Sequence, residues 1–305
     1  MRRDCPLVSL IIPTYERPTR LAACLHAVAQ LDYPTDRLQV IVVDDGSASP
    51  PSEVVASFQS RLDITLICKP HAGPAAARNA GAAQARGEFL AFTDDDCAPR
   101  PDWLRVLVDQ LTATPNCGVG GQTLNALGDN PYATASQLLI TYLYKYYNAI
   151  PHQARLLTSN NLAVPARLFR EIGGFDEHFG QAAGEDREFC DRWTHRGYRL
   201  IYVPEAVVEH AHAMSWRGFW RQHHNYGRAA FAFHVAHASR SGERVRMEPW
   251  RFYAELLSFP IQEMGLGRGW RLALLMGVTQ IANGLGFYWA RLRAARKGEA
   301  KPCRP

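Results

Sequence analysis

Up to about residue 115, the chain alternates short apolar runs with segments of helical periodicity, and this alternation constrains the fold more than any other feature. An unbroken apolar run that ends at Pro, Gly or Asp is typical of a strand buried on both faces. The expected strands are Leu7–Ile12, Val40–Val43, Ile64–Cys68 and Phe89–Phe92, and the expected helices are Leu21–Leu31, Ser52–Phe58, Pro74–Ala85 and Trp103–Leu111. Strands alternating with helices predict an α/β fold, with a mainly parallel sheet flanked by helices.

The rest of the chain has a less regular pattern. Helical spacing recurs at Tyr132–Tyr147, Ala166–Ile172 and Glu185–Trp193, and Arg199–Val203 has the pattern of a strand stopped by Pro204. From about Met214 onward the pattern is helical and aromatic, with a boundary near Gly242. We therefore expect one α/β domain over 1–213 and a helical C-terminal region over 214–305.

Composition narrows the class of protein. Charged residues make up 21% of the chain and the net charge is +5, which is ordinary for a folded soluble protein. The seven cysteines stand singly and are odd in number, which favours reduced thiols in the cytoplasm over a disulfide framework. The first apolar run has six residues and predicts a strand rather than a signal peptide. No wide basic stripe is present, so nucleic acid is not an expected partner.

One C-terminal segment has the features of an interface. Leu272 to Ala290 carries no charge, but its Thr, Gln, Asn and three Gly residues make it a poor membrane-spanning helix. Aromatic residues lie near its ends and basic residues follow it: Trp270, Tyr288, Trp289, Arg291, Arg293, Arg296 and Lys297. Three interpretations stay open, namely peripheral contact with the inner face of a membrane, a homo-oligomer contact, and a buried helix.

Polar residues follow three of the expected strands directly. Thr14-Tyr15-Glu16-Arg17 comes after the first strand, Asp44-Asp45 after the second, and Asp94 to Asp96 after the fourth. Open parallel sheets bind ligands beyond the carboxyl ends of their strands. Agreement among three independent strand ends predicts a ligand site at this edge.

The aspartate cluster is the strongest candidate within that site. Adjacent carboxylates repel one another, so Asp94, Asp95 and Asp96 need a counter-charge, and a hard divalent cation is the natural partner. Protein-bound Mg²⁺ or Mn²⁺ typically also contacts substrate phosphates. Taken alone, the cluster is better explained as a solvated acidic turn that caps the next helix.

Four other groups have both a chemical and a structural explanation. Asp44 and Asp45 suit a base or ribose, although Asp-Gly-Ser is also ordinary turn chemistry. Arg78 is either a surface arginine or a cation facing phosphates, and Glu185-Asp186 either caps a helix or supplies a general base. His210 and His212, two residues apart, would share one face of an extended strand and could join a metal site. No G-x-G-x-x-G follows the first strand, which argues against a nicotinamide site.

Taken in order, these pieces resemble a family-2 glycosyltransferase of the GT-A fold. The resemblance runs collinearly from about residue 7 to 212, and it lies in V-S-L-I-I-P-T-Y-E-R-P (8–18), I-V-V-D-D-G-S (41–47), the stretch ending F-T-D-D-D (77–96), S-N-N-L-A-V-P (from 159) and G-E-D-R-E-F (from 184). The Q-x-x-R-W motif of processive members is missing, so the resemblance implies a non-processive enzyme.

The resemblance implies a Rossmann-like GT-A domain with a nucleotide-sugar half over about 1–125 and an acceptor half over about 126–213. It assigns donor binding to Pro13, Tyr15, Glu16, Asp44, Asp45, Arg78, Asp94 and Asp95. It assigns the metal, Mn²⁺ or Mg²⁺, to Asp94, Asp96 and His210. It assigns acceptor binding to Asn160, Asn161 and Glu185, and the catalytic pair to Glu185 with Asp186 as the base.

The expected function is inverting transfer of a sugar from a nucleoside-diphosphate sugar to the hydroxyl of a carbohydrate, lipid-linked or small-molecule acceptor. Two alternatives remain. A non-catalytic nucleotide-sugar or carbohydrate binder would share the site without turnover. A nucleotidyltransferase would carry a Gly-rich, Arg-containing loop after the first strand, where this chain has Pro-Thr-Tyr-Glu-Arg-Pro.

Overall fold

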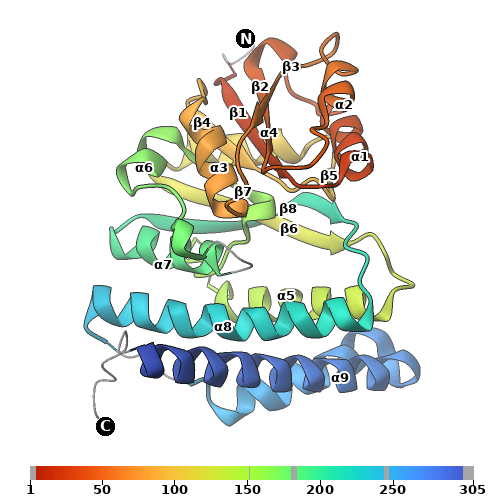
Figure 1. The fold of residues 1–305 in the computed structure, drawn as a ribbon, viewed down its shortest axis with the longest axis vertical. Helices are drawn as coiled ribbons and strands as arrows, with labels where there is room; N and C mark the ends of the chain where they lie inside the picture. Colours follow the sequence, from red (N-terminus) through yellow and green to blue (C-terminus); the bar gives the residue numbers. More distant parts are fainter. Residues whose placement is uncertain (1–4, 151, 180–183, 244–246, 298–305) are drawn as a thin grey trace. The chain divides into compact units, whose positions relative to one another are not determined.

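The computed structural model describes residues 5–150, 152–179, 184–243 and 247–297, which form two compact units (Figure 1). The first unit contains the described residues up to Ala126, most of 143–181, and Glu185–His212. The second contains Leu127–Tyr142, Gly184 and the described residues from Ala213 onward.

An eight-stranded sheet organises the first unit, in the order β3-β2-β1-β4-β7-β6-β8-β5 among the described residues. The strands are β1 (Val8–Thr14), β2 (Leu38–Asp44), β3 (Asp63–Cys68), β4 (Phe89–Phe92), β5 (Cys97–Pro99), β6 (Cys117–Asn125), β7 (Leu162–Pro165) and β8 (Arg199–His210). Strands β1 to β4 pair in parallel, as do β6 and β8, whereas β7 is antiparallel to β4 and β6, and β5 to β8. The predicted α/β sheet is confirmed, with a mixed second half.

Helices cover both faces of this sheet (Figure 1). They are α1 (Pro18–Val28), α2 (Ser52–Ala56), α3 (Pro74–Ala83), α4 (Trp103–Ala113), α6 (Ala166–Glu171) and α7 (Glu185–His195). Side chains alternate between the faces of a strand, so neighbours in β1 reach different helices. Leu10 and Ile12 join the core that α1 and α4 complete, whereas Ile11 faces α3. There a Cβ on Gly81 would lie 2.6 Å from Ile11, so helix and sheet approach closely.

The prediction that Pro204 ends the strand from Arg199 is wrong, because β8 continues to His210. Val203 pairs with Gly121 and Val207 with the next residue of β6, so the three residues 204–206 bulge out of the ladder. Proline has no N–H to donate, and a bulge is where a sheet tolerates it. A Cβ on Gly121 would lie 1.8 Å from the Ala206 carbonyl oxygen, so only glycine fits beside the bulge.

Strand β6 was not predicted, and its glycines explain why. Gly118, Gly120 and Gly121 interrupt the apolar run that marks other central strands. Each of them sits where a neighbour comes close: a Cβ would meet Leu200 at 2.9 Å from Gly118 and Leu157 at 2.7 Å from Gly120. The glycines that suggest a loop in the sequence therefore lie within a strand, at positions where a larger residue would clash. The short strand β5 was also missed.

The second unit is helical, as expected for the C-terminal region. It contains the first part of α5 (Pro131–Tyr147), α8 (Trp216–Ser241) and α9 (Trp250–Lys297), which is broken at Gly265 by a φ of 70°. Helix α8 ends at Gly242 in the left-handed conformation, which confirms the predicted boundary. Cβ atoms on Gly227 or Gly286 would collide with the partner helix backbone at 1.9 and 2.0 Å, so α8 and α9 touch at glycine. None of the described helices combines the length and apolarity needed to span a bilayer.

Candidate active site

The aspartate cluster lies in the turn that links β4 to β5. Strand β4 ends at Phe92 and β5 begins at Cys97, which is the register partner of His210 in β8. This antiparallel pairing brings the end of β8 beside Asp96, although the two segments are more than one hundred residues apart in sequence. The fold therefore joins the cluster and the late histidine that sequence analysis had named separately.

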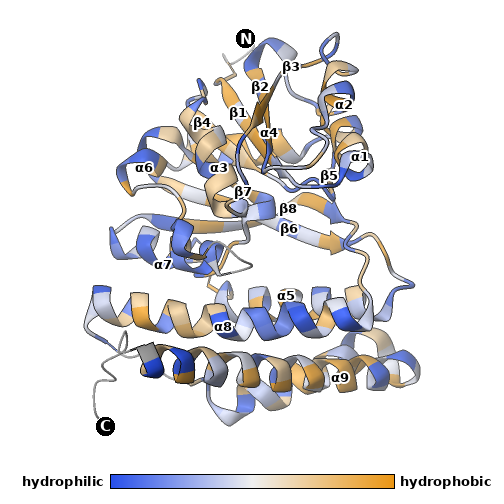
Figure 2. Cartoon of the chain, viewed as in Figure 1, coloured by the Kyte–Doolittle hydropathy of each residue, from blue (hydrophilic) through white to orange (hydrophobic). Residues whose placement is uncertain are grey.

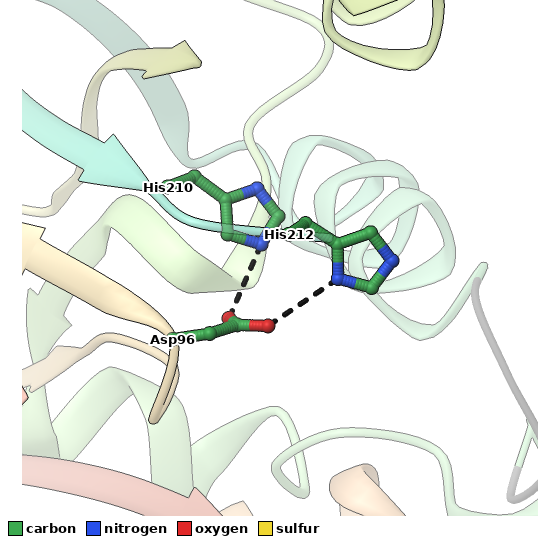
Figure 3. Close-up of side chains that lie close together, drawn as sticks. All are labelled: Asp96, His210 and His212. Atoms are coloured by element: carbon green, nitrogen blue, oxygen red, sulfur yellow. Dashed lines mark hydrogen bonds and ion pairs between the residues drawn. The ribbon is translucent and has the colours of Figure 1, made fainter. Parts of the chain in front are cut away.

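Asp96 meets two histidines (Figure 3). Its Oδ1 lies 3.1 Å from Nε2 of His210, and its Oδ2 lies 3.3 Å from Nδ1 of His212. One ligand atom from each of the three side chains falls within 4.8 Å of the others, a spacing that suits one metal ion. Of the three predicted metal ligands, Asp96 and His210 are thus brought together, with His212 in the place expected for Asp94.

Two arginines neutralise the cluster: Arg17, which sequence analysis placed after the first strand without a role, and Arg20, which it did not name. Arg17 donates from Nη1 to Asp95 and to Asp96, both at 3.3 Å, and Arg20 donates to Asp96 at 3.1 Å. Thr14 adds a hydroxyl hydrogen bond of 2.7 Å to Asp95. The available signal was the charge of three adjacent carboxylates, which requires cations nearby, and both arginines follow β1 at the same sheet edge.

Asp95 and Asp96 have different electrostatic surroundings. Burial raises the pKa of Asp95 to about 6, against the opposing effects of Thr14 and Arg17. Burial acts in the same direction on Asp96, but hydrogen bonds from His210 and His212 outweigh it and hold the pKa of Asp96 far below its ordinary value. The hydrogen bond to Asp96 and its charge likewise raise the pKa of His210, although burial disfavours the charged ring. Asp96 is therefore held in its ionised form, which is the form that binds a cation.

Arg78 links Asp94 to the start of α7. It donates from Nη2 to Asp94 at 2.5 Å and from Nη1 to Glu185 at 3.1 Å, with the guanidinium and Glu185 both buried. Three buried polar atoms around this bridge have no hydrogen-bond partner among the described residues: Nε of Arg78, Oγ1 of Thr93 and Oε2 of Glu185. Buried polar atoms are nearly always paired, so this group is where a polar ligand would fit.

Asp186 follows Glu185 in the first turn of α7, as expected. Burial and the neighbouring Glu185 carboxylate raise the pKa of Asp186 to about 7, while its hydrogen bond from the Arg187 amide and the charge of Arg78 act in the opposite direction. A carboxyl group with a pKa near neutrality can exchange a proton under ordinary conditions. The site thus contains a titratable group close to its charged bridge.

Asp45 is held by the loop between β3 and α3. Its carboxylate accepts hydrogen bonds from Lys69 Nζ at 2.8 Å and from the amides of Ala72 at 3.0 Å and Gly73 at 2.7 Å, and it lies 2.9 Å from Nδ1 of His71. Asp44 instead accepts from the amide and hydroxyl of Ser47, the turn bonding that its Asp-Gly-Ser context predicted. Sequence analysis missed Lys69 and His71.

Tyr15 and His71 form a partly exposed aromatic pair beside Asp45. Their rings stack with 4.4 Å between centroids, and Tyr15 is 44% exposed. Glu16 supports the same edge, because its amide donates to Ser47 at 2.7 Å and its carboxylate accepts from the Ala48 amide at 2.7 Å. Pro13 lies in β1 beyond the last residue paired with β4, where its missing N–H breaks no ladder bond.

The two asparagines have different neighbours. Asn161 is fully buried and accepts from Trp103 Nε1 and the Gly121 amide, while it donates to the carbonyls of Gln122 and Ala206. These four bonds use all the capacity of its amide, so Asn161 fastens the β8 bulge to β6. Asn160 accepts from the Thr158 hydroxyl at 2.7 Å.

The donor set determines which metal would fit. One carboxylate and two imidazoles suit a first-row transition ion such as Mn²⁺ better than Mg²⁺, which prefers oxygen ligands alone. The ionised state of Asp96 and the close ligand atoms fit such an ion. Asp94 instead forms an ion pair with Arg78.

Comparison with known sequences identifies relatives. Residues 9–173 match the family model described as glycosyl transferase family 2. The chain is similar to glycosyltransferase AglE of Haloferax volcanii, at 30% identity over 69% of this chain and 68% of that protein. It is also similar to the pre-mycofactocin glycosyltransferase of Mycobacterium tuberculosis, at 33% identity over 78% of this chain and 50% of that protein. The matched region is therefore about half the length of the second relative.

Solved structures share the fold. The mannosyltransferase PcManGT from Pyrobaculum calidifontis, in complex with GDP-Man and Mn²⁺, superposes with a TM-score of 0.61 and 23% identity, over 97% of this chain and 81% of that one. TarS 1-349 of S. aureus, in complex with UDP-GlcNAc, gives a TM-score of 0.55 and 16% identity, over 97% and 93%. At these identities the likeness shows the GT-A fold alone.

Proposed function

Since the chain belongs to glycosyl transferase family 2, we propose that it moves a sugar from a nucleoside-diphosphate sugar to an acceptor hydroxyl, with inversion at the anomeric carbon. One observation carries the proposal. Three segments far apart in sequence bring their ionisable side chains together: the aspartates after β4, Glu185 at the start of α7, and His210 at the end of β8. Arg78 bridges Asp94 and Glu185, and His210 faces Asp96. Structures of PcManGT with GDP-Man and of TarS with UDP-GlcNAc support a nucleotide-sugar donor.

The donor nucleotide would lie against the edge formed after β1 and β2. A base can stack on the exposed Tyr15–His71 pair, and Asp45 lies next to it with a carboxylate already ordered by the loop. In this proposal Pro13, Glu16 and Asp44 shape the edge, and Arg78 faces the diphosphate with its unpaired Nε.

Proton transfer is assigned to Asp186. An attacking acceptor hydroxyl must lose its proton as its oxygen bonds to the anomeric carbon, and a carboxylate with a pKa of about 7 accepts a proton well at neutral pH. Glu185 and Asn160 would orient the acceptor, because Oε2 of Glu185 is buried without a partner near the same bridge. With the nucleophile and leaving group on opposite sides of one carbon, a single displacement inverts it.

The metal is assigned to Asp96, His210 and His212, with Mn²⁺ preferred to Mg²⁺ because two of the three ligands are imidazoles. When bound, the ion would offset negative charge on the departing diphosphate as a Lewis acid. Arg17 and Arg20 hold Asp96 in place and would share that task as fixed cations.

The proposed acceptor is a carbohydrate, a lipid-linked or a small-molecule hydroxyl, and the proposed location is the cytoplasm. The six cysteines that the structure describes are free thiols, which supports a reducing compartment. The region over about 1–213 is proposed to act as the catalytic part, with donor binding in its first half.

A donor screen tests the proposal. The full chain is mixed with GDP- and UDP-linked sugars with and without Mn²⁺, thermal shift identifies binders, and mass spectrometry with candidate acceptors identifies products. We expect one nucleotide class to stabilise the protein in the presence of Mn²⁺ and to release nucleoside diphosphate. Binding without any release, with or without acceptor, would favour the non-catalytic binder and overturn the proposal.

A further inference from the structure

The second piece of α9, after the break at Gly265, carries a stripe of exposed apolar side chains. Its members recur at intervals of three, four or seven residues, which places them on one face of a helix. They are each between 49% and 76% exposed, and we call them the apolar stripe: Leu266, Trp270, Leu274, Ile281, Leu285, Tyr288 and Leu292. Figure 2 shows the hydrophobic character of this helix.

The stripe is not the face that holds the helix in its unit. Leu272, Met276, Thr279 and Ala282 are at most 1% exposed and pack inward. A shift of two positions along an α-helix turns the side chain by about 200°, so Leu272 points away from the side of Trp270 and Leu274. The helix therefore has two apolar faces, one used for folding and one turned outward.

The charged residues of the segment that carries the stripe have a single sign. From Met264 to Gly298 the sequence contains six basic residues and no acidic one, and five of these are exposed arginines: Arg268, Arg271, Arg291, Arg293 and Arg296. From Ala213 to Pro305 there are 15 Lys and Arg against 5 Asp and Glu, although the whole chain carries only +5. The excess positive charge is thus concentrated in the part of the sequence that bears the stripe.

We infer that the apolar stripe is a docking surface for an anionic lipid bilayer, on which the helix lies in the plane of the interface. Apolar side chains would enter the acyl boundary while the arginines contact lipid phosphates. Trp270 and Tyr288 have the amphipathic rings that favour this depth, and the Arg271 guanidinium lies 5.4 Å from the Trp270 ring centroid.

Charge decides between this occupant and a second copy of the chain. A symmetric pair of these helices would oppose arginine to arginine with no acidic residue in the segment to compensate, and like charges at close range are unfavourable. An anionic bilayer supplies the negative charge that a second copy of this segment lacks. The length also fits, because the 27 residues from Leu266 to Leu292 span about 40 Å, ample for surface contact, and no described helix qualifies to cross the bilayer.

Vesicle co-sedimentation of the full chain tests the inference, with pure phosphatidylcholine vesicles compared to mixed phosphatidylcholine–phosphatidylglycerol vesicles. We expect binding to the anionic vesicles that falls with added salt, and at least about tenfold weaker binding to neutral ones. Ile281→Glu should weaken binding to anionic vesicles at least about tenfold, because it places a charge in the acyl boundary. Val235→Glu is the matched control, since Val235 is 51% exposed on α8 against 59% for Ile281, and it should bind as wild type.

Circular dichroism checks that both variants fold, and light scattering measures oligomeric state without lipid. Equal binding to neutral and anionic vesicles, or undiminished binding by Ile281→Glu, would overturn the inference. So would a wild-type dimer that Ile281→Glu converts to monomer without lipid, because the stripe would then be covered by a second copy. Release of nucleoside diphosphate, measured without vesicles, reports on the catalytic proposal separately.

Discussion

The imidazole rings of His210 and His212 stack with 5.2 Å between their centroids, and each presents one nitrogen to the same carboxylate. His210 ends β8, and His212 follows it past the end of the strand. The two rings thus offer a pair of ligands from one strand end, and Asp96 supplies the third from the opposite turn.

Replacing His212 by alanine should weaken Mn²⁺ binding. The variant loses one of three proposed ligands, so we expect the Kd for Mn²⁺ in the presence of nucleoside diphosphate to rise by at least about tenfold, an effect that even supporting residues of metal sites produce. Isothermal titration calorimetry measures it. His195→Ala, which removes an exposed histidine at the end of α7, is the control. An unchanged Kd in the His212 variant would remove it from the metal site.

Asp186→Asn should lower kcat by about 10²–10⁴-fold, because it removes the proposed base. In the wild type, the carboxylate form is the active one, and a pKa raised to about 7 means that kcat/KM rises with pH and levels off above neutrality. Initial rates across pH 5 to 9 measure both effects. Asp109→Asn on the exposed surface of α4 should behave as wild type. A profile flat from pH 5 to 9 would contradict the assignment.

The Asp186 carboxyl group should also lower the stability of the folded protein at high pH. A raised folded-state pKa means that the native protein binds more protons than the unfolded chain between pH 3.8 and about 7, so stability falls as pH rises through that window. Asp186→Asn cannot ionise, and its melting temperature at pH 8 should exceed that of the wild type by at least about 2 °C. The difference should narrow as the pH is lowered towards 5. A variant less stable than wild type at pH 8 would show that burial is not what raises this pKa.

Arg78→Lys should lower kcat/KM by about 10–100-fold despite keeping the charge. A guanidinium reaches Asp94 and Glu185 with separate nitrogens, and an ammonium group cannot reproduce that fork. Steady-state kinetics measure the loss. Arg86→Lys changes an exposed ion pair with Asp63 in the same way and should alter the rate less than about twofold. Equal effects of the two substitutions would exclude a special role for Arg78.

Periodicity predicted the first half of the sheet well because its strands are buried on both faces. Such strands are continuous apolar runs, and Phe89–Phe92 matches the structure residue for residue. Polar residues beyond these strand ends met at one edge, as their parallel direction required. The antiparallel half was harder to predict. The glycines of β6 are needed because neighbouring residues approach closely, and the proline of β8 is tolerated because it lies in a bulge. Neither condition is visible in a local sequence pattern.

The carboxylates and His210 were predictable from the sequence, whereas two of the arginines that neutralise them were not. Asp96, His210 and Glu185 follow recognisable local signals, whereas Arg17 and Arg20 look like ordinary surface residues until the turn after β4 is placed beside them. The exchange of Asp94 for His212 in the proposed ligand set has the same origin. It depends on Arg78, which reaches Asp94 from a different helix.

The three-residue bulge in β8 also determines which face of the sheet each later residue of the strand occupies. Inserting an odd number of residues exchanges the two faces of a strand for every residue that follows. The number of residues between Val203 and Val207 therefore decides whether His210 points toward Asp96 or toward the opposite side of the sheet. Deleting one residue there must either shrink the bulge or shift the register of the following residues, and a shift by one residue would turn His210 away from Asp96. A change in the length of this short stretch can therefore disturb the site at the far end of the strand.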